Sequence, residues 1–263
     1  MCRSHVGLLE GRQVLRVRNL SVGYGAEPVL EGIDLEVKAG EFASLIGPSG
    51  SGKTSVLRAV TRLLEPLAGR TELDVPPNDV GFLFQDDALL PWRTARQNVA
   101  LGLRIRGRAI KDAEAEAGHW LAQLGLEVFG DRYPRQVSGG QRKRVAIAQV
   151  LALKPKLLLM DEPFASLDAI VRTRITQELL GWVEQEHLTV LLVTHDLEEA
   201  ITVSDVVYVL SQGPRAGIRA RHEIPIPRPR NVLETRRDPL FAPLLTALWD
   251  ELSAASVSEE SPR

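Results

Sequence analysis

Apolar and polar residues alternate in two stretches near the start of the chain, from Val14 to Val17 and from Ile33 to Val37. Alternation with a period of two is typical of half-buried antiparallel strands. A third stretch, Phe42 to Ile46, is apolar without alternating and predicts a strand covered on both faces. After a glycine-rich loop, apolar residues recur at helical spacing from Lys53 to Leu64, and this spacing predicts a helix.

The second half of the chain alternates predicted helices with short apolar strands. Before it, the stretch from Thr94 to Gln123 is rich in alanine and charged residues, and it predicts a separate helical lobe. The alternation that follows is typical of parallel βαβ units, and it comprises Gln141–Ala152 (helix), Leu157–Met160 (strand), Ile170–Glu186 (helix), Val190–Thr194 (strand) and Leu197–Val203 (helix). The tail after Gln212 is rich in Pro, Arg and Gly, and one short helix is expected over Leu240 to Leu252.

Composition narrows the class of protein. The 263 residues are 44% hydrophobic and 25% charged, which is enough to bury a sizeable core. A net charge of −2 argues against a general polyanion binder. The single cysteine, Cys2, excludes an internal disulfide and a cysteine-ligated zinc site. With neither a signal-peptide core nor an apolar stretch of about 18 residues, we expect a soluble cytoplasmic protein.

The glycine-rich loop fits the phosphate-binding pattern G-x-x-x-x-G-K-[ST]. It stands between a predicted strand and a predicted helix, as that pattern requires, and reads Gly47-Pro48-Ser49-Gly50-Ser51-Gly52-Lys53-Thr54. Glycines let backbone N–H groups point inward, and a helix N-terminus adds positive charge. Lys53 would reach the β- and γ-phosphates, and the Thr54 hydroxyl could coordinate Mg²⁺. An ordinary glycine-rich turn is the alternative, but it gives no reason for the lysine, the threonine and the flanking elements to coincide.

Two adjacent carboxylates, Asp161 and Glu162, end an apolar strand. They are costly there unless positive charge sits nearby, and a Mg²⁺–nucleotide complex would supply it. Asp161 would then face the metal, and Glu162 could polarise an attacking water. The alternative is that either residue caps the next helix, and the two roles do not exclude each other.

A second anion-binding element precedes another periodic helix and reads Ser138-Gly139-Gly140-Gln141. A serine and two glycines at a helix N-terminus offer N–H groups, a hydroxyl and close approach. Because the chain has only one phosphate loop, this element would serve a nucleotide bound by another copy. Taken by itself, the element could be a plain helix cap.

Together these motifs resemble the ATP-binding cassette ATPases. The similarity runs from about Val14 to Leu210, and the motifs follow the family's order: Gly47 to Thr54, Gln85, Ser138 to Gln141, Leu157 to Glu162, Ser166-Leu167-Asp168 and His195. The segments Gln85 to Trp92, Asp161 to Phe164 and Ile224 to Arg230 are similar to the importer ATPases of the nitrate, sulfonate and taurine group.

The resemblance implies an α/β P-loop fold with a mixed core sheet, an antiparallel β subdomain and a helical signature subdomain. It places the ATPase domain at residues 14–211, with the helical subdomain inserted at about 86–152, and it leaves 212–263 as a C-terminal extension with one short helix.

The resemblance also implies roles for single residues. Tyr24 would stack on adenine, and Ser55 would join the nucleotide-binding loop. Gln85 would reach Mg²⁺ and the attacking water, and His195 would hydrogen-bond the γ-phosphate. Asp168 would lie at a dimer interface. Judged alone, His195 would be a structural histidine and Tyr24 a surface turn residue.

The implied cofactors are ATP and Mg²⁺, and the implied assembly is a head-to-tail homodimer on the cytoplasmic face of a membrane. Its partners would be integral membrane permease subunits and an extracytoplasmic solute-binding protein, with no nucleic acid. Trp92 lies in the apolar segment that would contact the permease, whereas Trp120, Trp182 and Trp249 are expected to pack inside. The alternative is a non-transport cassette ATPase that acts on DNA or ribosomes. The chain has no tandem cassette, long coiled coil or basic stripe to favour it.

Overall fold

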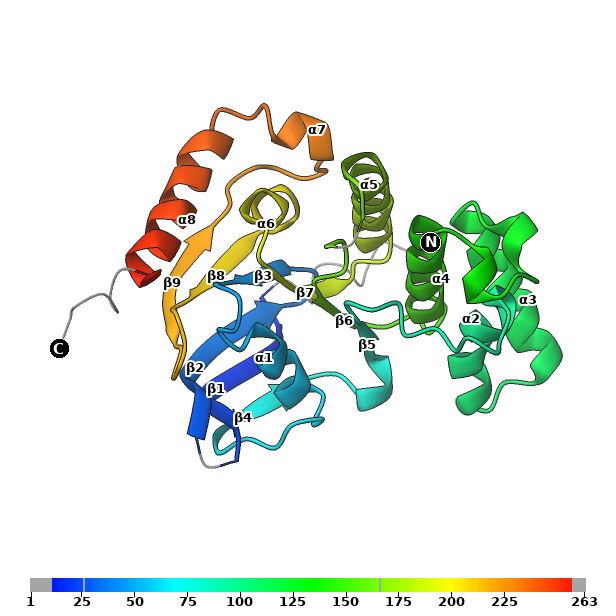
Figure 1. The fold of residues 1–263 in the computed structure, drawn as a ribbon, viewed down its shortest axis with the longest axis horizontal. Helices are drawn as coiled ribbons and strands as arrows, with labels where there is room; N and C mark the ends of the chain where they lie inside the picture. Colours follow the sequence, from blue (N-terminus) through cyan, green and yellow to red (C-terminus); the bar gives the residue numbers. More distant parts are fainter. Residues whose placement is uncertain (1–10, 26, 166, 257–263) are drawn as a thin grey trace.

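The computed structural model describes residues 11–25, 27–165 and 167–256, and two β-sheets form its framework (Figure 1). The larger sheet has six strands in the order β5 (Val80–Leu83), β6 (Leu157–Asp161), β7 (Thr189–Thr194), β3 (Phe42–Ile46), β8 (Val206–Leu210) and β9 (Ile218–Glu223). The smaller sheet is antiparallel, in the order β2 (Glu27–Lys38), β1 (Gln13–Tyr24) and β4 (Ala68–Leu73).

The central strands of the larger sheet are covered on both faces. Every residue of β3, β6, β7 and β8 is buried, as expected for the non-alternating run Phe42–Ile46. These strands and β5 run parallel, and β9 joins the edge antiparallel to β8. Parallel strands bring their C-terminal ends to one edge of the sheet, so the loops that follow β3, β5, β6 and β7 meet there.

The helices are α1 (Lys53–Val60), α2 (Ala95–Ile105), α3 (Ile110–Gln123), α4 (Gly139–Leu151), α5 (Ala169–Gln185), α6 (Leu197–Val203), α7 (Val232–Thr235) and α8 (Phe241–Ser256), with 3₁₀ turns at Pro77–Asp79, Glu127–Phe129 and Pro134–Gln136. Helix α1 shares one apolar core with both sheets. Helices α2, α3 and α4 group at one end of the molecule, and α8 lies beside α6 at another (Figure 1). Within the described residues, no helix is long and apolar enough to cross a membrane.

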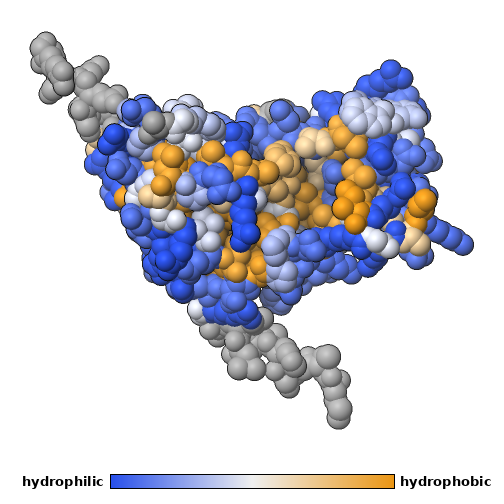
Figure 2. Space-filling model, turned by 90° about the horizontal axis from the view of Figure 1, so that it is seen from below, coloured by the Kyte–Doolittle hydropathy of each residue, from blue (hydrophilic) through white to orange (hydrophobic). Residues whose placement is uncertain are grey.

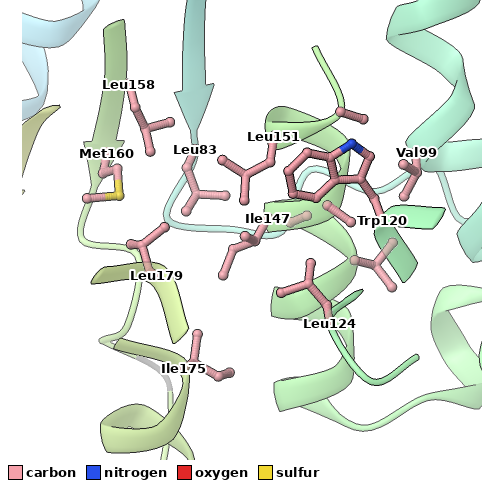
Figure 3. Close-up of a cluster of buried hydrophobic side chains, with 14 of the residues drawn as sticks. Leu83, Val99, Trp120, Leu124, Ile147, Leu151, Leu158, Met160, Ile175 and Leu179 are labelled. Atoms are coloured by element: carbon pink, nitrogen blue, oxygen red, sulfur yellow. The ribbon is translucent and has the colours of Figure 1, made fainter. Parts of the chain in front are cut away.

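A second apolar core joins the helical lobe to the main sheet. Leu83 at the end of β5 lies beside Ile147 and Leu151 of α4, with Trp120 of α3 on the far side of α4 (Figure 3). The Trp120 and Trp182 rings lie 5.2 Å apart, so both pack as predicted. The lobe is therefore packed directly against β5, the strand that leads to Gln85.

The structure confirms the predicted fold class and corrects two details at the C-terminal end. The extension after residue 211 holds β9, α7 and the 16-residue α8 in place of one short helix. Strand β9 completes the larger sheet, so its residues pack as part of the main body. Trp249 was expected to pack, but it is 63% exposed. The proposed domain boundaries themselves stay a prediction.

Candidate nucleotide-binding site

The phosphate loop links β3 to α1 and depends on glycine. Gly52, directly before the helix, has a φ of 90°, where L-residues are strained. A Cβ on Gly52 would lie 2.8 Å from Leu30 Cγ and 2.9 Å from Val29 Cγ1. At Gly47, a Cβ would lie 2.9 Å from Leu210 Cβ. The positive φ and the short distances to neighbouring side chains therefore both favour glycine at position 52.

Lys53 folds back across this loop. Its ammonium donates hydrogen bonds of 2.9 Å to the carbonyl oxygens of Gly47 and of Pro48, and the residue is buried. Burial lowers the pKa of Lys53, while the charges of Glu162 and Asp161 oppose that shift. The loop thus holds a cation where the predicted β- and γ-phosphates would lie.

Thr54 and Asp161 bring two oxygens together at the same edge. The Thr54 hydroxyl donates a 2.9 Å hydrogen bond to Asp161 Oδ1. Burial raises the pKa of Asp161, and the Thr54 hydrogen bond opposes the shift. A largely buried carboxylate beside a hydroxyl suits Mg²⁺, which takes oxygen ligands. Among residues 11–25, 27–165 and 167–256, no group of three or more His, Cys, Asp or Glu could enclose a metal, so a Mg²⁺ ion here would take further oxygens from other sources, such as phosphate or water.

Glu162 contacts His195. The His195 Nδ1 lies 3.0 Å from Glu162 Oε2, and a carboxylate only accepts, so Nδ1 carries the hydrogen. Glu162 has a φ of 43°, in the left-handed region that costs a non-glycine residue energy. Its backbone N–H donates to the Val193 carbonyl at 2.8 Å, which holds it at the end of β7. The predicted catalytic carboxylate and the predicted γ-phosphate contact are thus brought together.

Gln85 and Tyr24 flank this edge. Gln85 is exposed in the loop after β5, the strand that pairs with β6. Tyr24 ends β1 and is 59% exposed. Its hydroxyl lies 3.4 Å from Ser55 Oγ and accepts a 2.9 Å hydrogen bond from Arg58. The Ser55 contact, aided by Arg58, lowers the pKa of Tyr24 although burial opposes it. The Tyr24 hydroxyl is therefore held against α1.

The second anion-binding element opens α4. Ser138 caps this helix, with Gln141 N–H donating to Ser138 Oγ at 3.3 Å and Ser138 N–H donating to Gln141 Oε1 at 2.8 Å. The element lines a cleft of about 600 Å³ together with Asp168, which caps α5 through a 3.0 Å bond from Val171 N–H. No residue of the phosphate loop lines this cleft. Ser138 therefore caps α4, and anion binding by this element stays a prediction. Ser166, from the same motif as Asp168, lies outside the described residues.

Two contacts were missed by the sequence reasoning. Lys143 donates to the Gln85 carbonyl, and Arg58 holds the Tyr24 hydroxyl. Lys143 stands four residues before Ile147 and eight before Leu151, so a lysine occupies the apolar face of α4. That break in the pattern was the available signal. The sequence gives no comparable signal for the Arg58 contact with Tyr24, because a basic residue near the end of a helix is common.

A family profile described as "ABC transporter" matches residues 30–165. The chain belongs to the ABC transporter family. Among curated relatives, the sulfate/thiosulfate import ATP-binding protein CysA of Synechocystis is 42% identical over 216 residues, which are 79% of this chain and 61% of CysA. The chain therefore spans about three fifths of that relative's length.

Two further relatives match almost end to end. The nitrate import ATP-binding protein NrtD of Synechococcus elongatus is 38% identical, with 87% of this chain and 86% of NrtD covered. The aliphatic sulfonates import ATP-binding protein SsuB 2 of Mesorhizobium japonicum is 40% identical, with 87% and 88% covered. The resemblance predicted from the motifs is confirmed.

Solved structures of bacterial ABC transporter cassettes share the fold. The dimeric structure of the cassette MJ0796 is 31% identical and superposes with a TM-score of 0.71, covering 80% of this chain and 98% of that one. A dimeric post-hydrolysis state of MJ0796 bound to ADP and Pi superposes with a TM-score of 0.70 at 31% identity, with the same coverage. The chain thus has the fold of ABC transporter cassettes, as predicted, and the roles of its single residues remain predictions.

Proposed function

We propose that this chain is the ATP-hydrolysing subunit of an ABC importer. The observation that carries the proposal is one edge of the core sheet where Lys53, Thr54, Asp161, Glu162 and His195 meet within hydrogen-bond reach of one another or of the phosphate loop. The names of the relatives above further support import, and they point to oxyanion solutes such as nitrate and sulfonates.

The phosphate loop binds and orients ATP. Its inward N–H groups and the α1 N-terminus would hold the β-phosphate. Lys53, already poised over the loop, would exchange its bonds to the Gly47 and Pro48 carbonyls for phosphate oxygens. Tyr24 would stack on adenine from the position that Ser55 and Arg58 support. Mg²⁺, when bound to the nucleotide, would neutralise phosphate charge, with Thr54, Asp161 and Gln85 as its protein-side contacts.

Glu162 would take the proton from the attacking water. The His195 hydrogen bond fixes the direction of its carboxylate, and Glu162 adopts its left-handed backbone directly after the end of β6. Only one oxygen of Glu162 bonds His195, so the other can accept from water. Hydrolysis then leaves ADP and phosphate, and the lost contacts let the site reopen.

A second copy would complete each site. The cleft beside Ser138 and Asp168 lies apart from the phosphate loop of its own chain, which supports a head-to-tail dimer with two nucleotides between the copies. The dimeric MJ0796 cassettes support the same arrangement. ATP would favour the closed dimer because only that state contacts both faces of the nucleotide.

The helical lobe would dock a membrane permease. Within the lobe, Trp92 (70%), Ile105 (77%) and Val128 (81%) have the largest exposed fractions among the apolar side chains, and an exposed apolar surface commonly marks an interface. Seen from below, apolar surface runs mainly across the middle of the molecule, with smaller patches toward the end where the lobe lies (Figure 2). Asn98, fully buried, donates to the Leu90, Arg93 and Thr94 carbonyls and accepts from Leu90 N–H, so the backbone around Trp92 is held in shape. The chain would thus sit peripherally on the cytoplasmic membrane face, with a solute-binding protein delivering solute from the other side.

The test is Glu162→Gln. This change keeps the size of the side chain and removes the base, so we expect ATP binding to persist, turnover to fall about 100-fold or more, and ATP to trap a dimer visible by light scattering. Glu223→Gln, on an exposed carboxylate of β9, is the matched control and should behave as the wild type. A Glu162→Gln variant with normal turnover would refute the assignment.

A further inference from the structure

Lys143 is buried where α4 meets the loop that carries Gln85. The residue is 1% exposed, and its ammonium lies 2.9 Å from the Gln85 carbonyl oxygen, 3.4 Å from that of Phe84 and 3.1 Å from Asp87 Oδ1. These acceptors match the three donors of a lysine ammonium. A buried ammonium group with an acceptor for each of its three hydrogens holds those acceptors in one arrangement.

Asp87 is held by α4 through a second basic residue. Arg142 Nε lies 3.4 Å from Asp87 Oδ2, while Lys143 takes the other carboxylate oxygen. Both basic residues directly follow Gln141, the last residue of the capped element at the α4 N-terminus. The Phe84–Asp87 loop is therefore attached to the helix whose first turn would contact the partner's nucleotide.

The rest of α4 makes this attachment stiff. Ile147 and Leu151 continue the face on which Lys143 stands, and they share a core with Leu83 of β5 (Figure 3). A Cβ on Gly81 would lie 2.6 Å from Val150 Cγ1, so β5 and α4 approach closely just before the loop. A displacement of α4 would carry the loop with it.

We propose that Lys143 is a positioning residue that fixes Gln85 to the helix bearing Ser138 to Gln141. Closure of that helix on a nucleotide held by the partner copy would thereby set Gln85 against the chain's own nucleotide. The expected effect of Lys143 on the rate of ATP hydrolysis rests on the proposed function. The attachment itself can be measured without ATP. A purely structural role, in which Lys143 only neutralises Asp87, would not act through Gln85.

The first experiment measures the attachment. A nitroxide spin label is placed at the exposed Asp86→Cys in a Cys2→Ser background, and its mobility is read from the continuous-wave spectrum of the nucleotide-free protein. Lys143→Met should increase label mobility, because the loop loses its anchor. Lys156→Met is the matched control: Lys156 pairs with Asp79 at 3.0 Å, but its side chain is 66% exposed and lies away from the loop. Equal spectra for Lys143→Met and wild type would overturn the attachment.

The second experiment tests whether Lys143 acts through Gln85. Because Lys143 binds the Gln85 backbone carbonyl, Gln85→Ala leaves that contact in place while removing the side chain. We expect Lys143→Met to lower kcat about 10- to 100-fold, as displaced catalytic groups do, with ATP affinity changed less than about twofold. In a Gln85→Ala background, the same change should lower kcat no further. Multiplying losses in the double variant would assign Lys143 a purely structural role and overturn the proposal.

Folding is controlled separately. Lys143→Met leaves Asp87 partly unpaired, so the pair Lys143→Met with Asp87→Asn removes both charges together. This pair should unfold near the wild-type temperature and show the same label mobility and the same kcat loss as Lys143→Met alone. A pair with wild-type mobility and kcat would contradict the role of Lys143. Failure of the proposed function would show instead in Glu162→Gln, whose turnover would then equal that of the wild type.

Discussion

The hydrogen bond between Thr54 and Asp161 joins the two side chains that we propose as ligands of Mg²⁺. Removing it should change both the stability of the protein and its binding of Mg²⁺–ATP. Thr54→Val keeps the shape of the side chain and removes the hydroxyl, leaving the buried Asp161 carboxylate without that donor. A hydrogen bond to a charged group contributes about 1.5–3 kcal/mol. For a chain of this size, such a loss lowers the unfolding temperature by about 3–12 °C.

The pH dependence has a definite sign. Burial raises the pKa of Asp161 above its ordinary value of 3.8, and the Thr54 hydrogen bond limits that rise. Removing the bond raises the folded-state pKa further, so the variant loses stability as pH climbs from the unfolded value through the folded one. The difference in unfolding free energy between variant and wild type should therefore be small near pH 4 and larger at pH 8, measured by urea titration.

Thr61→Val is the matched control for this change. Thr61 lies at the end of the same helix, and its hydroxyl donates to the neutral carbonyls of Leu57 and Arg58. Its loss should cost about 1 kcal/mol at every pH. ATP titrations add a second readout, in which Thr54→Val should weaken binding with Mg²⁺ present and leave binding in EDTA unchanged. A Thr54→Val effect as flat with pH as that of Thr61→Val would refute the reasoning.

Three further changes test other parts of the site. Gly52→Ala forces a side chain into a φ of 90° and a Cβ to 2.8 Å from Leu30 Cγ, so we expect a cost of about 1–3 kcal/mol in thermal unfolding and weaker ATP binding. Tyr24→Ala should weaken ATP binding about fivefold, the equivalent of one aromatic contact, whereas Tyr24→Phe keeps the ring and should change it little, as read by calorimetric titration. Burial raises the pKa of Glu199 to about 7, so the wild type should lose stability as pH rises from about 4.5 to about 7, while Glu199→Gln should lack this component in thermal scans.

Local patterns were sufficient for much of the fold. The apolar run Phe42–Ile46 and the periodic segment after it predicted β3 and α1, because burial on both faces and helical spacing each leave a signal within a few residues. The helix ended earlier than predicted, at Val60, because Arg62 adopts a left-handed φ of 59° that the apolar spacing did not register. Strand β9 was missed because it is an edge strand of alternating exposure, Ile218–Glu223, in a stretch rich in turn formers.

The site was predictable as far as its chemistry is contiguous in sequence. The phosphate loop and the Asp161-Glu162 pair each form a contiguous sequence pattern, so both can be identified without the structure. Contacts between distant segments carry no such pattern. The Lys143 contact with the Gln85 carbonyl joins residues 58 apart, and the Glu162 contact with His195 joins residues 33 apart. Gln85, Glu162 and His195 each follow a strand of the larger sheet and Lys143 lies in α4, so only the packed structure supplies these pairings.

If two copies share each nucleotide as proposed, neither of the two anion-binding elements would be sufficient alone. The phosphate-loop half holds Lys53, Thr54 and Asp161 in prepared contacts, while His195, with 55% of its side chain exposed, leaves one face of the site open to solvent. The cleft beside Ser138 has the helix N-terminus but lacks the loop. An anion bridging the two elements on different copies would gain both sets of donors at once. This is the physical reason to expect that ATP, through its triphosphate, drives the association of two chains.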